Sequence, residues 1–200
     1  MNIVLASILG YLFGSIPFAL VIGKVFYKTD IRQHGSGNLG GTNAGRTLGA
    51  KAGVSVILFD VLKGVIAMLI VSFFSKEAII YAGFFTTLGH CFPVFANFKG
   101  GKAVSTAFGF LIGISIFLTQ NYVFDFIIPL GIFFVLLFLS KMVSFSSMIA
   151  LACATVLLYV TQSNIQVSIA FTIITLIVIY RHKENISRIL NKTERKITWM

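Results

Sequence analysis

The residue types best suited to chemistry gather in one short stretch between two apolar segments. The thirteen residues from His34 to Arg46 include five glycines, two asparagines, one serine, one threonine and one arginine. Glycines allow a backbone to curl until several N–H groups point at one spot, and such a nest binds anions. Hydroxyl, amide and guanidinium groups add donors that suit phosphate oxygens. The stretch therefore predicts a phosphate-binding loop.

An alternative interpretation of this stretch is a flexible connector between two helices. Flexibility alone would not require Thr42, Asn43 and Arg46, which favours the anion-binding role. A nucleotide-binding P-loop is not indicated anywhere in the chain. Before Gly101-Lys102, Ala96 stands where that motif needs a glycine, and no Ser or Thr follows the lysine.

A second polar element lies inside an apolar run. Asp60 and Lys63 are three residues apart, so on a helix they share one face and can pair. Charges are unfavourable in lipid unless they are partnered, which places this pair toward the interior of a helix bundle. The pair either fixes the packing or serves a substrate, with Lys63 contacting a phosphate and Asp60 orienting its neighbours.

A third polar segment, residues 89–102, is expected to leave the membrane, turn and re-enter. Pro93 ends the preceding helix, and Gly100 allows close backbone approach between two lysines. The segment is either an ordinary basic anchor or a phosphate-binding turn. Its candidate site residues are His90, Lys99, Gly101 and Lys102. A histidine here is more typical of a packed helix end than of a base.

Two further polar segments lie near the C-terminus. Ser144 and Ser146 form a short corner whose hydroxyls either donate to phosphate or cap the next helix. The tail begins at Arg181, and its His182 and Asn185 would share one face of a helix. A basic interfacial helix would explain the charges of the tail but not this His-x-x-Asn pair.

Composition limits the class of protein. The 200 residues are 57% hydrophobic and only 11% charged, whereas a soluble domain carries about 25% charged residues. We therefore expect one polytopic integral membrane domain over residues 1–200. The net charge of +10 belongs to residues that flank apolar runs, so nucleic acid is not an expected partner. Cys91 and Cys153 lack a paired spacing, which indicates reduced thiols and no metal site.

Seven apolar runs predict an all-α membrane protein with seven transmembrane helices. Several runs hold only about 15–18 residues, short of the ~20 of a full span, so five spans are the alternative. The runs cover residues 2–23, 53–74, 78–92, 103–119, 122–139, 147–161 and 165–180. The N-terminal run lacks the features of a cleaved signal peptide and is expected to stay as the first span.

Basic residues are distributed unevenly around these runs. With the N-terminus outside, the segments 24–51, 91–102, 140–146 and 181–200 all face the cytoplasm and hold 14 of the 16 Lys and Arg residues. This arrangement follows the positive-inside rule and puts the C-terminus in the cytoplasm. It also brings all of the polar loop and tail motifs to the cytoplasmic side of the cell membrane.

One-sided polarity bears on the class of function. A small transporter or channel for phosphate or phosphoesters would place polar groups along a path near the middle of the bilayer. The loops on the other side are short and chemically plain. We therefore favour an enzyme at the membrane surface that acts on a water-soluble anion, and keep the transporter or channel as the alternative.

Taken together, the polar segments resemble one family along the whole chain: the bacterial acyl-phosphate:glycerol-3-phosphate acyltransferases, or PlsY family. The matching motifs are Gly14-Ser15-Ile16-Pro17, Ser36-Gly37-Asn38, Thr42-Asn43, Arg46, Asp60-x-x-Lys63-Gly64, Gly89-His90, Phe98-Lys99-Gly100-Gly101-Lys102, Val143-Ser144-Phe145-Ser146-Ser147 and Arg181-His182-x-x-Asn185-Ile186. The chain departs from the family pattern at Leu39 and Gly41, where Pro and Ala are usual, and at Ala103, where Gly is usual.

The resemblance implies the first acylation step of phospholipid synthesis. A fatty acyl group would move from acyl phosphate to the 1-hydroxyl of glycerol 3-phosphate, which gives lysophosphatidic acid and phosphate. Acyl-CoA and acyl carrier protein would not be direct donors, and no cofactor or metal is implied. Membrane lipids are the other expected partners, and the sequence leaves the oligomeric state open and compatible with a monomer.

The resemblance also suggests how the donors divide between the two phosphates that such a site must hold. The acyl phosphate would be bound, and its reaction catalysed, by Ser36, Gly37, Asn38, Gly40, Thr42 and Asn43. Glycerol 3-phosphate would be bound by Arg46, Lys102, Ser144, His182 and Asn185. Secondary candidates are Asp60, Lys63, His90, Lys99, Gly101 and Ser146.

The destination of the hydroxyl proton is open. The common glycerophosphate acyltransferases use a His-x4-Asp pair, but Leu39, Phe95 and Ser187 stand five residues after the three histidines. We favour a substrate phosphate as the proton acceptor, because its second pKa is ~6 and a base near the working pH is efficient. His182 is the alternative base, with Glu184 as its nearest carboxylate in sequence.

Two other enzyme classes fit the sequence less well. A CDP-alcohol phosphotransferase needs an aspartate-rich metal motif, and the six acidic residues here are scattered. An acyl-CoA-dependent acyltransferase is disfavoured because the His-x4-Asp pair is missing.

Overall fold

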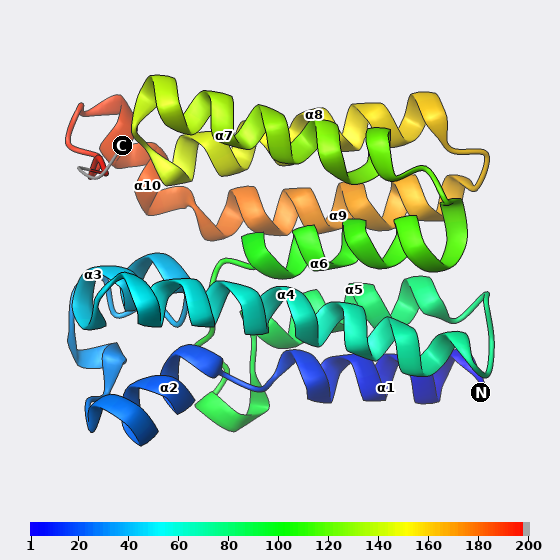
Figure 1. Cartoon of the computed structure of the whole chain (residues 1–200), viewed down its shortest axis with the longest axis horizontal. Helices are drawn as coiled ribbons and strands as arrows, with labels where there is room; N and C mark the ends of the chain where they lie inside the picture. The colour runs from blue at the N-terminus through cyan, green and yellow to red at the C-terminus, as the bar shows by residue number, and fades with distance from the viewer. Residues whose placement is uncertain (198–200) are drawn as a thin grey trace. The chain divides into compact units, whose positions relative to one another are not determined.

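The computed structural model describes residues 1–197 and contains only helices, turns and loops in that range (Figure 1), which confirms the all-α prediction. It divides into two compact units, Met1–Gly113 and the part that begins at Ile114. The helices of the first unit are α1 (Ile3–Gly14), α2 (Phe18–Tyr27), η1 (Ile31–Gln33), α3 (Gly41–Leu48), α4 (Ala50–Ser72), α5 (Ile79–Cys91), η2 (Val94–Ala96) and α6 (Val104–Ile114), whose last residue opens the second unit.

Up to residue 197, the second unit contains two short π-helices and four α-helices. These are η3 (Ser115–Thr119), η4 (Val123–Ile127), α7 (Ile128–Ser140), α8 (Val143–Thr161), α9 (Ile165–Arg181) and α10 (Lys183–Leu190). In sequence, α7, α8 and α9 follow one another through short turns, and each packs against the next.

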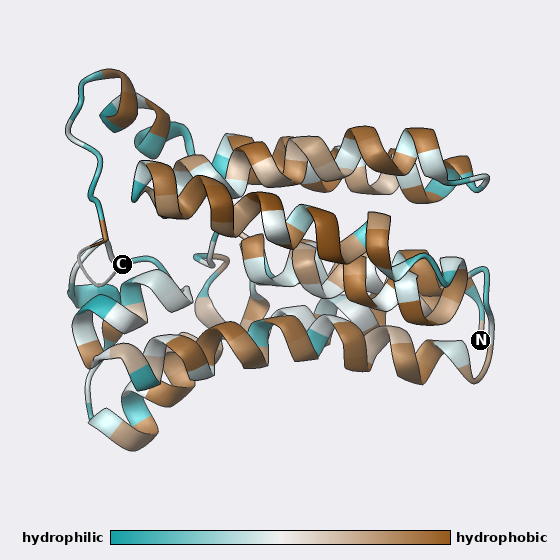
Figure 2. Ribbon diagram, turned by 45° about the horizontal axis from the view of Figure 1, so that its top comes forward, coloured by the Kyte–Doolittle hydropathy of each residue, from teal (hydrophilic) through white to brown (hydrophobic). Residues whose placement is uncertain are grey.

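Several helices are long and apolar enough to cross a bilayer. Within residues 1–197, five segments satisfy that description: Ile3–Tyr27, Ala50–Ser72, Ile79–Ala96, Val123–Ser140 and Val143–Thr161. The α9–α10 pair, bent by 58°, makes a sixth if it is counted as one span, and Val104–Thr119 is a shorter apolar helix. Hydrophobic residues cover most of the long helices, whereas hydrophilic ones gather mainly at helix ends, in loops and on the short helices α3 and α10 (Figure 2). The seven-span count and the outward N-terminus remain predictions.

The first predicted span is two helices instead of one. Helix α1 ends at Gly14 and α2 begins at Phe18, with Ser15, Ile16 and Pro17 between them. Proline has no N–H to donate and disfavours the helical conformation of the residue before it, so the helix breaks here. The Ile16 carbonyl at the break accepts from the Phe18 N–H at 3.2 Å and from the Lys63 ammonium at 3.1 Å.

Helix α1 packs along α5 at very short range. A Cβ added at Gly10 would collide with the Ala82 carbonyl, and one added at Gly14 would collide with the carbonyl of Thr86. In lipid, helices associate through such close backbone packing, because the surrounding chains are as apolar as the side chains themselves. The α1–α5 contact therefore fixes the scaffold on which the end of α5 is presented.

The second unit contains a buried carboxylate in η4, close to the turn between its two π-helices. Asp125, 1% exposed, accepts hydrogen bonds from the Thr119 hydroxyl and from Gln162 Nε2 at 2.7 Å. Gln120 between the π-helices has φ 53°, which reverses the chain. The Asp125 side chain thus links η3, η4 and the end of α8.

Candidate functional site

The glycine-rich loop depends on backbone conformations that favour glycine. Gly35 and Gly37 have φ values of 64° and 68°, in the left-handed region that side chains rarely adopt. A Cβ on Gly35 would also collide with Asn43 Oδ1. After the loop, Gly40 precedes α3 without a side-chain cap, so the first N–H groups of α3 lie next to the predicted anion-binding residues.

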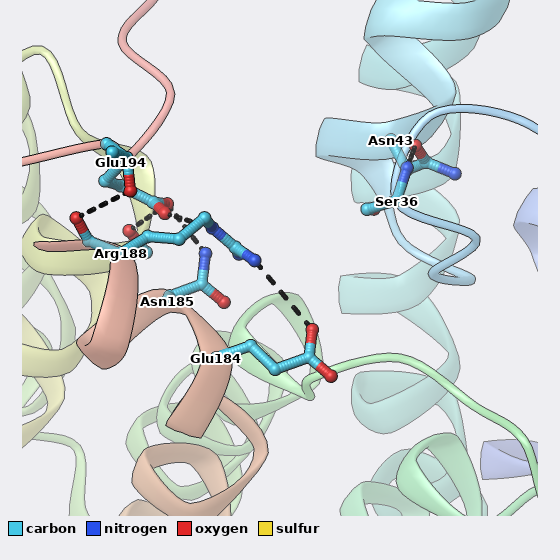
Figure 3. Close-up of polar contacts among 8 residues, drawn as sticks. Ser36, Asn43, Glu184, Asn185, Arg188 and Glu194 are labelled. Atoms are coloured by element: carbon cyan, nitrogen blue, oxygen red, sulfur yellow. Dashed lines mark hydrogen bonds and ion pairs between the residues drawn. The ribbon is translucent and has the colours of Figure 1, made fainter. Parts of the chain in front are cut away.

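Asn43 holds this loop from within. Its Oδ1 accepts a hydrogen bond from the Ser36 N–H at 2.9 Å, and its Nδ2 donates to the carbonyls of Ile31 at 3.3 Å and His34 at 3.1 Å. The side chain is 3% exposed. Figure 3 shows the Asn43 amide beside the Ser36 backbone. Asn43 is therefore built into the loop, whereas Ser36, Thr42 and Arg46 are exposed.

The entrance to the loop is fixed by a charged pair. Asp30 accepts from the Arg32 N–H, from Arg32 Nε at 2.9 Å and from the second guanidinium nitrogen at 2.6 Å. The hydrogen bond from the Arg32 side chain lowers the pKa of Asp30 to about 2. Asp30 caps the start of η1, and η1 ends directly before His34, where the glycine-rich loop begins. On α3, Thr42 and Arg46 are four residues apart and share one face.

A buried cluster of three ionisable side chains lies between α4 and α5. Lys63 Nζ is 2.8 Å from Asp60 Oδ1 and 2.9 Å from His90 Nδ1, and the last two atoms are 3.4 Å apart. The side chains of Asp60 and Lys63 are each 2% exposed. The sequence pair Asp60–Lys63 is thus confirmed as an ion pair, and the structure adds His90 to it.

The segment after α5 turns back onto the end of that helix. The Gly100 N–H donates to the Cys91 carbonyl at 3.2 Å, and the Gly101 N–H donates to the His90 carbonyl at 3.0 Å. These bonds satisfy carbonyls that the end of a helix leaves without partners. Lys102 follows this turn and is half-buried, and Lys99 precedes it and is exposed.

In the second unit, a carboxylate joins two of the predicted residues. Glu194 Oε1 accepts hydrogen bonds from Ser144 Oγ at 2.7 Å and from Asn185 Nδ2 at 2.6 Å. Glu194 Oε2 accepts from Arg188 Nε at 2.8 Å (Figure 3). Burial raises the pKa of Glu194, but the three hydrogen bonds and the Arg188 charge outweigh it, so the net pKa is lowered.

Sequence reasoning missed Glu194 and Arg188 as parts of this arrangement. A usable signal was present, because Glu194 is one of only six acidic residues and stands between Lys192 and Arg195 in the basic tail. Glu184, the carboxylate nearest to His182 in sequence, instead lies 3.9 Å from Arg188. The Ser146 hydroxyl donates to the Met142 carbonyl at 2.9 Å within α8, as a helix residue commonly does.

His182 lies at the sharp bend between α9 and α10 and is 3% exposed. Its Nδ1 is 2.7 Å from the Val178 carbonyl. Since a carbonyl can only accept, Nδ1 must carry the proton, and a neutral ring then has its lone pair on Nε2. The hydrogen bond to the Val178 carbonyl therefore orients the His182 ring.

Comparison with known proteins finds one family along nearly the whole chain. The family model described as Glycerol-3-phosphate acyltransferase matches residues 4–192. The chain is 47% identical over 201 residues to the glycerol-3-phosphate acyltransferase of Bacillus subtilis (strain 168), with both chains covered completely. It is also 47% identical over 204 residues to the protein of that name from Listeria monocytogenes, covering 100% of this chain and 98% of the relative.

Two similar solved structures are also of a glycerol 3-phosphate acyltransferase. The crystal structure of PlsY (YgiH), an integral membrane glycerol 3-phosphate acyltransferase in its glycerol 3-phosphate form, is similar with a TM-score of 0.89 and 35% identity. That match covers 98% of this chain and 96% of the other. The lysophosphatidic acid form of the same enzyme gives a TM-score of 0.86, with 98% and 95% covered.

Proposed function

This chain belongs to the glycerol-3-phosphate acyltransferase family of integral membrane enzymes, and from that membership we propose its donor, product and chemistry. The donor is an acyl phosphate, and the acceptor is the 1-hydroxyl of glycerol 3-phosphate. The products are lysophosphatidic acid and inorganic phosphate. The similar crystal structures are of a glycerol 3-phosphate form and a lysophosphatidic acid form, which supports both the acceptor and the product.

The observation that carries this proposal is the construction of the glycine-rich loop. Asn43 uses its amide to hold the loop backbone, while Ser36 and Thr42 stay exposed beside the uncapped start of α3. Hydroxyls and helical N–H groups in this arrangement suit a phosphate that gains charge as it leaves. Ser36, Gly37, Asn38, Gly40 and Thr42 therefore bind the acyl phosphate, and Asn43 keeps them in place.

The donors proposed for glycerol 3-phosphate are Arg46, Lys102, Ser144, His182 and Asn185. Because the Ser144 hydroxyl has one proton and donates it to Glu194, it must release that carboxylate before it can donate to a phosphate. Arg46 offers a planar fork that can grip a phosphate with two hydrogen bonds. The hydroxyl oxygen attacks the acyl carbonyl carbon, and the bond from that carbon to the phosphate oxygen breaks. Because a mixed anhydride is already activated, positioning and charge stabilisation supply most of the catalysis.

A substrate phosphate takes the hydroxyl proton in this proposal. Its second pKa of ~6 is close to the working pH, and no carboxylate is needed to orient His182, whose Nδ1 faces the Val178 carbonyl. His182 then holds glycerol 3-phosphate. The His182→Gln variant decides the point: loss of glycerol 3-phosphate affinity supports a binding role, whereas lost turnover with unchanged affinity makes His182 the base.

One experiment tests the proposed donor. Purified protein in detergent is incubated with glycerol 3-phosphate and either palmitoyl phosphate or palmitoyl-CoA, and lysophosphatidic acid is measured. Product from palmitoyl phosphate alone is expected. Product from the CoA donor alone, or from neither donor, would overturn the proposal.

We place the reaction on the cytoplasmic side of the cell membrane, because the basic residues flank the polar segments. Single cysteines at Lys51 and at Lys76, introduced into a chain without Cys91 and Cys153, test this. An impermeant thiol reagent should label Lys51→Cys in inside-out vesicles and Lys76→Cys in right-side-out vesicles. The reverse pattern would place the site outside.

A further inference from the structure

The buried cluster of Asp60, Lys63 and His90 has no direct part in the reaction proposed above. Its side chains are 2%, 2% and 6% exposed. Burying charges is unfavourable unless their partners are accurately placed. The contacts around Asp60, Lys63 and His90 therefore indicate the role of these buried side chains.

On one side, the cluster contacts the break between α1 and α2. Lys63 Nζ donates to the Ile16 carbonyl at 3.1 Å, and it lies 5.8 Å from the centre of the Phe18 ring. The same ammonium lies 2.9 Å from His90 Nδ1. Since a charged ammonium can only donate, Nδ1 accepts, and the neutral ring carries its proton on Nε2. Lys63 thus fixes both the orientation and the tautomer of His90, and Asp60, 2.8 Å from Lys63 Nζ, holds that ammonium in place.

The other edge of the His90 ring lies against Gly101. A Cβ added at Gly101 would collide with His90 Nε2. The Gly101 N–H also donates to the His90 carbonyl at 3.0 Å. Both the backbone and the ring of His90 therefore contact Gly101. The same Cβ would come within 2.8 Å of the Leu39 carbonyl in the glycine-rich loop. The turn is therefore confined between the His90 ring and the glycine-rich loop.

The residue that follows this confined turn is Lys102. Its backbone position is set by Gly101 before it and by Ala103 after it, which has φ 62°. The glycine-rich loop has its own support, since Asn43 bonds to Ile31, His34 and Ser36. We therefore expect movement of the His90 ring to displace Lys102 more than Ser36.

We propose that Asp60, Lys63 and His90 are positioning residues that hold the Gly100–Gly101 turn and thereby place the Lys102 ammonium for glycerol 3-phosphate. They do not touch substrate. This inference rests on the proposed role of Lys102 in binding glycerol 3-phosphate, and it predicts a substrate-selective effect. Loss of the His90 ring weakens glycerol 3-phosphate binding and leaves recognition of the acyl phosphate largely intact.

The first test uses His90→Asn in the full chain in detergent. Asparagine keeps an acceptor close to the Nδ1 position for Lys63 and removes the ring edge against Gly101. The dissociation constant of glycerol 3-phosphate, measured by calorimetry, should rise roughly tenfold. The KM for glycerol 3-phosphate should rise in parallel, while the KM for palmitoyl phosphate stays within about twofold. Lys102→Ala should show the same selectivity.

Thr87→Val is the matched control. Thr87 lies one turn earlier on α5, is completely buried, and its hydroxyl donates only within the helix, to the Gly83 carbonyl at 3.2 Å. It perturbs the packing of the same helix without reaching the turn. Both substrate affinities should match those of the parent protein.

Gly101→Ala approaches the same contact from the other side and serves if His90→Asn does not fold. Its Cβ must displace the His90 ring, so it should also weaken glycerol 3-phosphate binding. The same Cβ would come within 2.8 Å of the Leu39 carbonyl in the glycine-rich loop, so this variant is judged by the glycerol 3-phosphate dissociation constant and not by selectivity. In the double variant with His90→Asn, the added effect of Gly101→Ala should be smaller than in the parent. Additive effects would contradict the contact that the proposal requires.

The proposal is overturned if His90→Asn raises both KM values equally, or if either single variant leaves the glycerol 3-phosphate dissociation constant within about twofold of the parent. The calorimetric measurement needs no acyl donor. A parent protein that binds glycerol 3-phosphate but makes no product from palmitoyl phosphate would therefore refute the proposed function, while the binding of the variants would still decide the positioning role.

Discussion

The side-chain oxygen of Asn43 accepts a hydrogen bond from the backbone N–H of Ser36 at 2.9 Å. This bond crosses the base of the glycine-rich loop and leaves the Ser36 hydroxyl outside it. We predict that Asn43→Ala releases the loop, because two carbonyls and one N–H lose their partner together. A displacement of about 1 Å at a reacting group can lower the rate by ~100-fold, so kcat/KM for palmitoyl phosphate should fall by that order.

Thr47→Val is the control for this prediction, since it lies one turn further along the same short helix α3. It should keep most of the activity. Equal losses in kcat/KM for the two variants, or an unchanged Asn43→Ala enzyme, would show that the Asn43 bonds do not organise the site.

Arg46→Lys tests whether the guanidinium fork is needed or only its charge. Arg46 is exposed on the face of α3 that also carries Thr42. Lysine keeps the charge but cannot form two parallel hydrogen bonds with one phosphate. The KM for glycerol 3-phosphate should rise by at least ~10-fold, which corresponds to about 1.4 kcal/mol. Lys51→Arg, the reverse change at an exposed position in the next helix, should be neutral, and a fully active Arg46→Lys enzyme would refute the fork.

The ion pair of Asp60 and Lys63 yields a stability prediction. Removing one partner leaves a buried charge uncompensated, which destabilises a protein by about 3–5 kcal/mol. Replacing both by apolar residues removes that problem. Asp60→Asn should therefore lower the thermal midpoint in detergent more than the double variant Asp60→Leu/Lys63→Met. A double variant that is less stable than the single one would indicate that the pair itself stabilises the fold.

Ala103 offers a prediction specific to this chain. It is fully buried with φ 62°, directly before α6, at a position where the family resemblance implies glycine. The left-handed conformation costs an L-residue about 1–2 kcal/mol, and glycine returns part of this as chain entropy. Ala103→Gly should change stability by less than ~1 kcal/mol, while Ala103→Val, with its branched side chain, should lose more than ~2 kcal/mol. Thermal unfolding of the two variants side by side measures this difference.

The fold was largely predictable because lipid imposes simple rules on sequence. Long apolar runs with basic flanks predicted the all-α membrane architecture, and the ordered motifs predicted the family, which the comparisons confirm. The break at Ser15–Pro17 was less evident. Pro17 marks it in the sequence, but only the structure shows that the Ile16 carbonyl is used by Lys63 from another helix.

The site was predictable as a set of donors but not as a set of roles. Asn43 and Ser36 are both polar loop residues in the sequence, yet one is buried in bonds to the backbone and the other is exposed. His90 resembled an ordinary helix-end histidine until it was found beside Lys63. Such distinctions depend on contacts between residues far apart in the chain, which spacing along one helix cannot reveal.

Glu194 gives the prediction for pH. Its folded-state pKa is lowered from the ordinary value of 4.5, because its hydrogen bonds and the Arg188 charge outweigh burial. A lowered pKa means that the folded state favours the ionised form. The stabilisation is therefore present above pH ~4.5 and is lost as the pH falls through the lower folded-state pKa. Thermal unfolding measured from pH 7 down to pH 3 should show this loss.

Glu194→Gln should remove that part of the pH dependence and lower stability at neutral pH. Glutamine can still accept from Ser144 and Asn185, but one of its two terminal atoms is now a donor facing Arg188 Nε. A hydrogen bond to a charged group contributes about 1.5–3 kcal/mol, which corresponds to roughly 3–10 °C in midpoint. Glu184→Gln is the control, because its contact with the same arginine is 3.9 Å long and its side chain is 77% exposed. That variant should shift stability by less than ~1 kcal/mol, and equal effects of the two glutamates would argue that the Glu194 contacts contribute nothing specific.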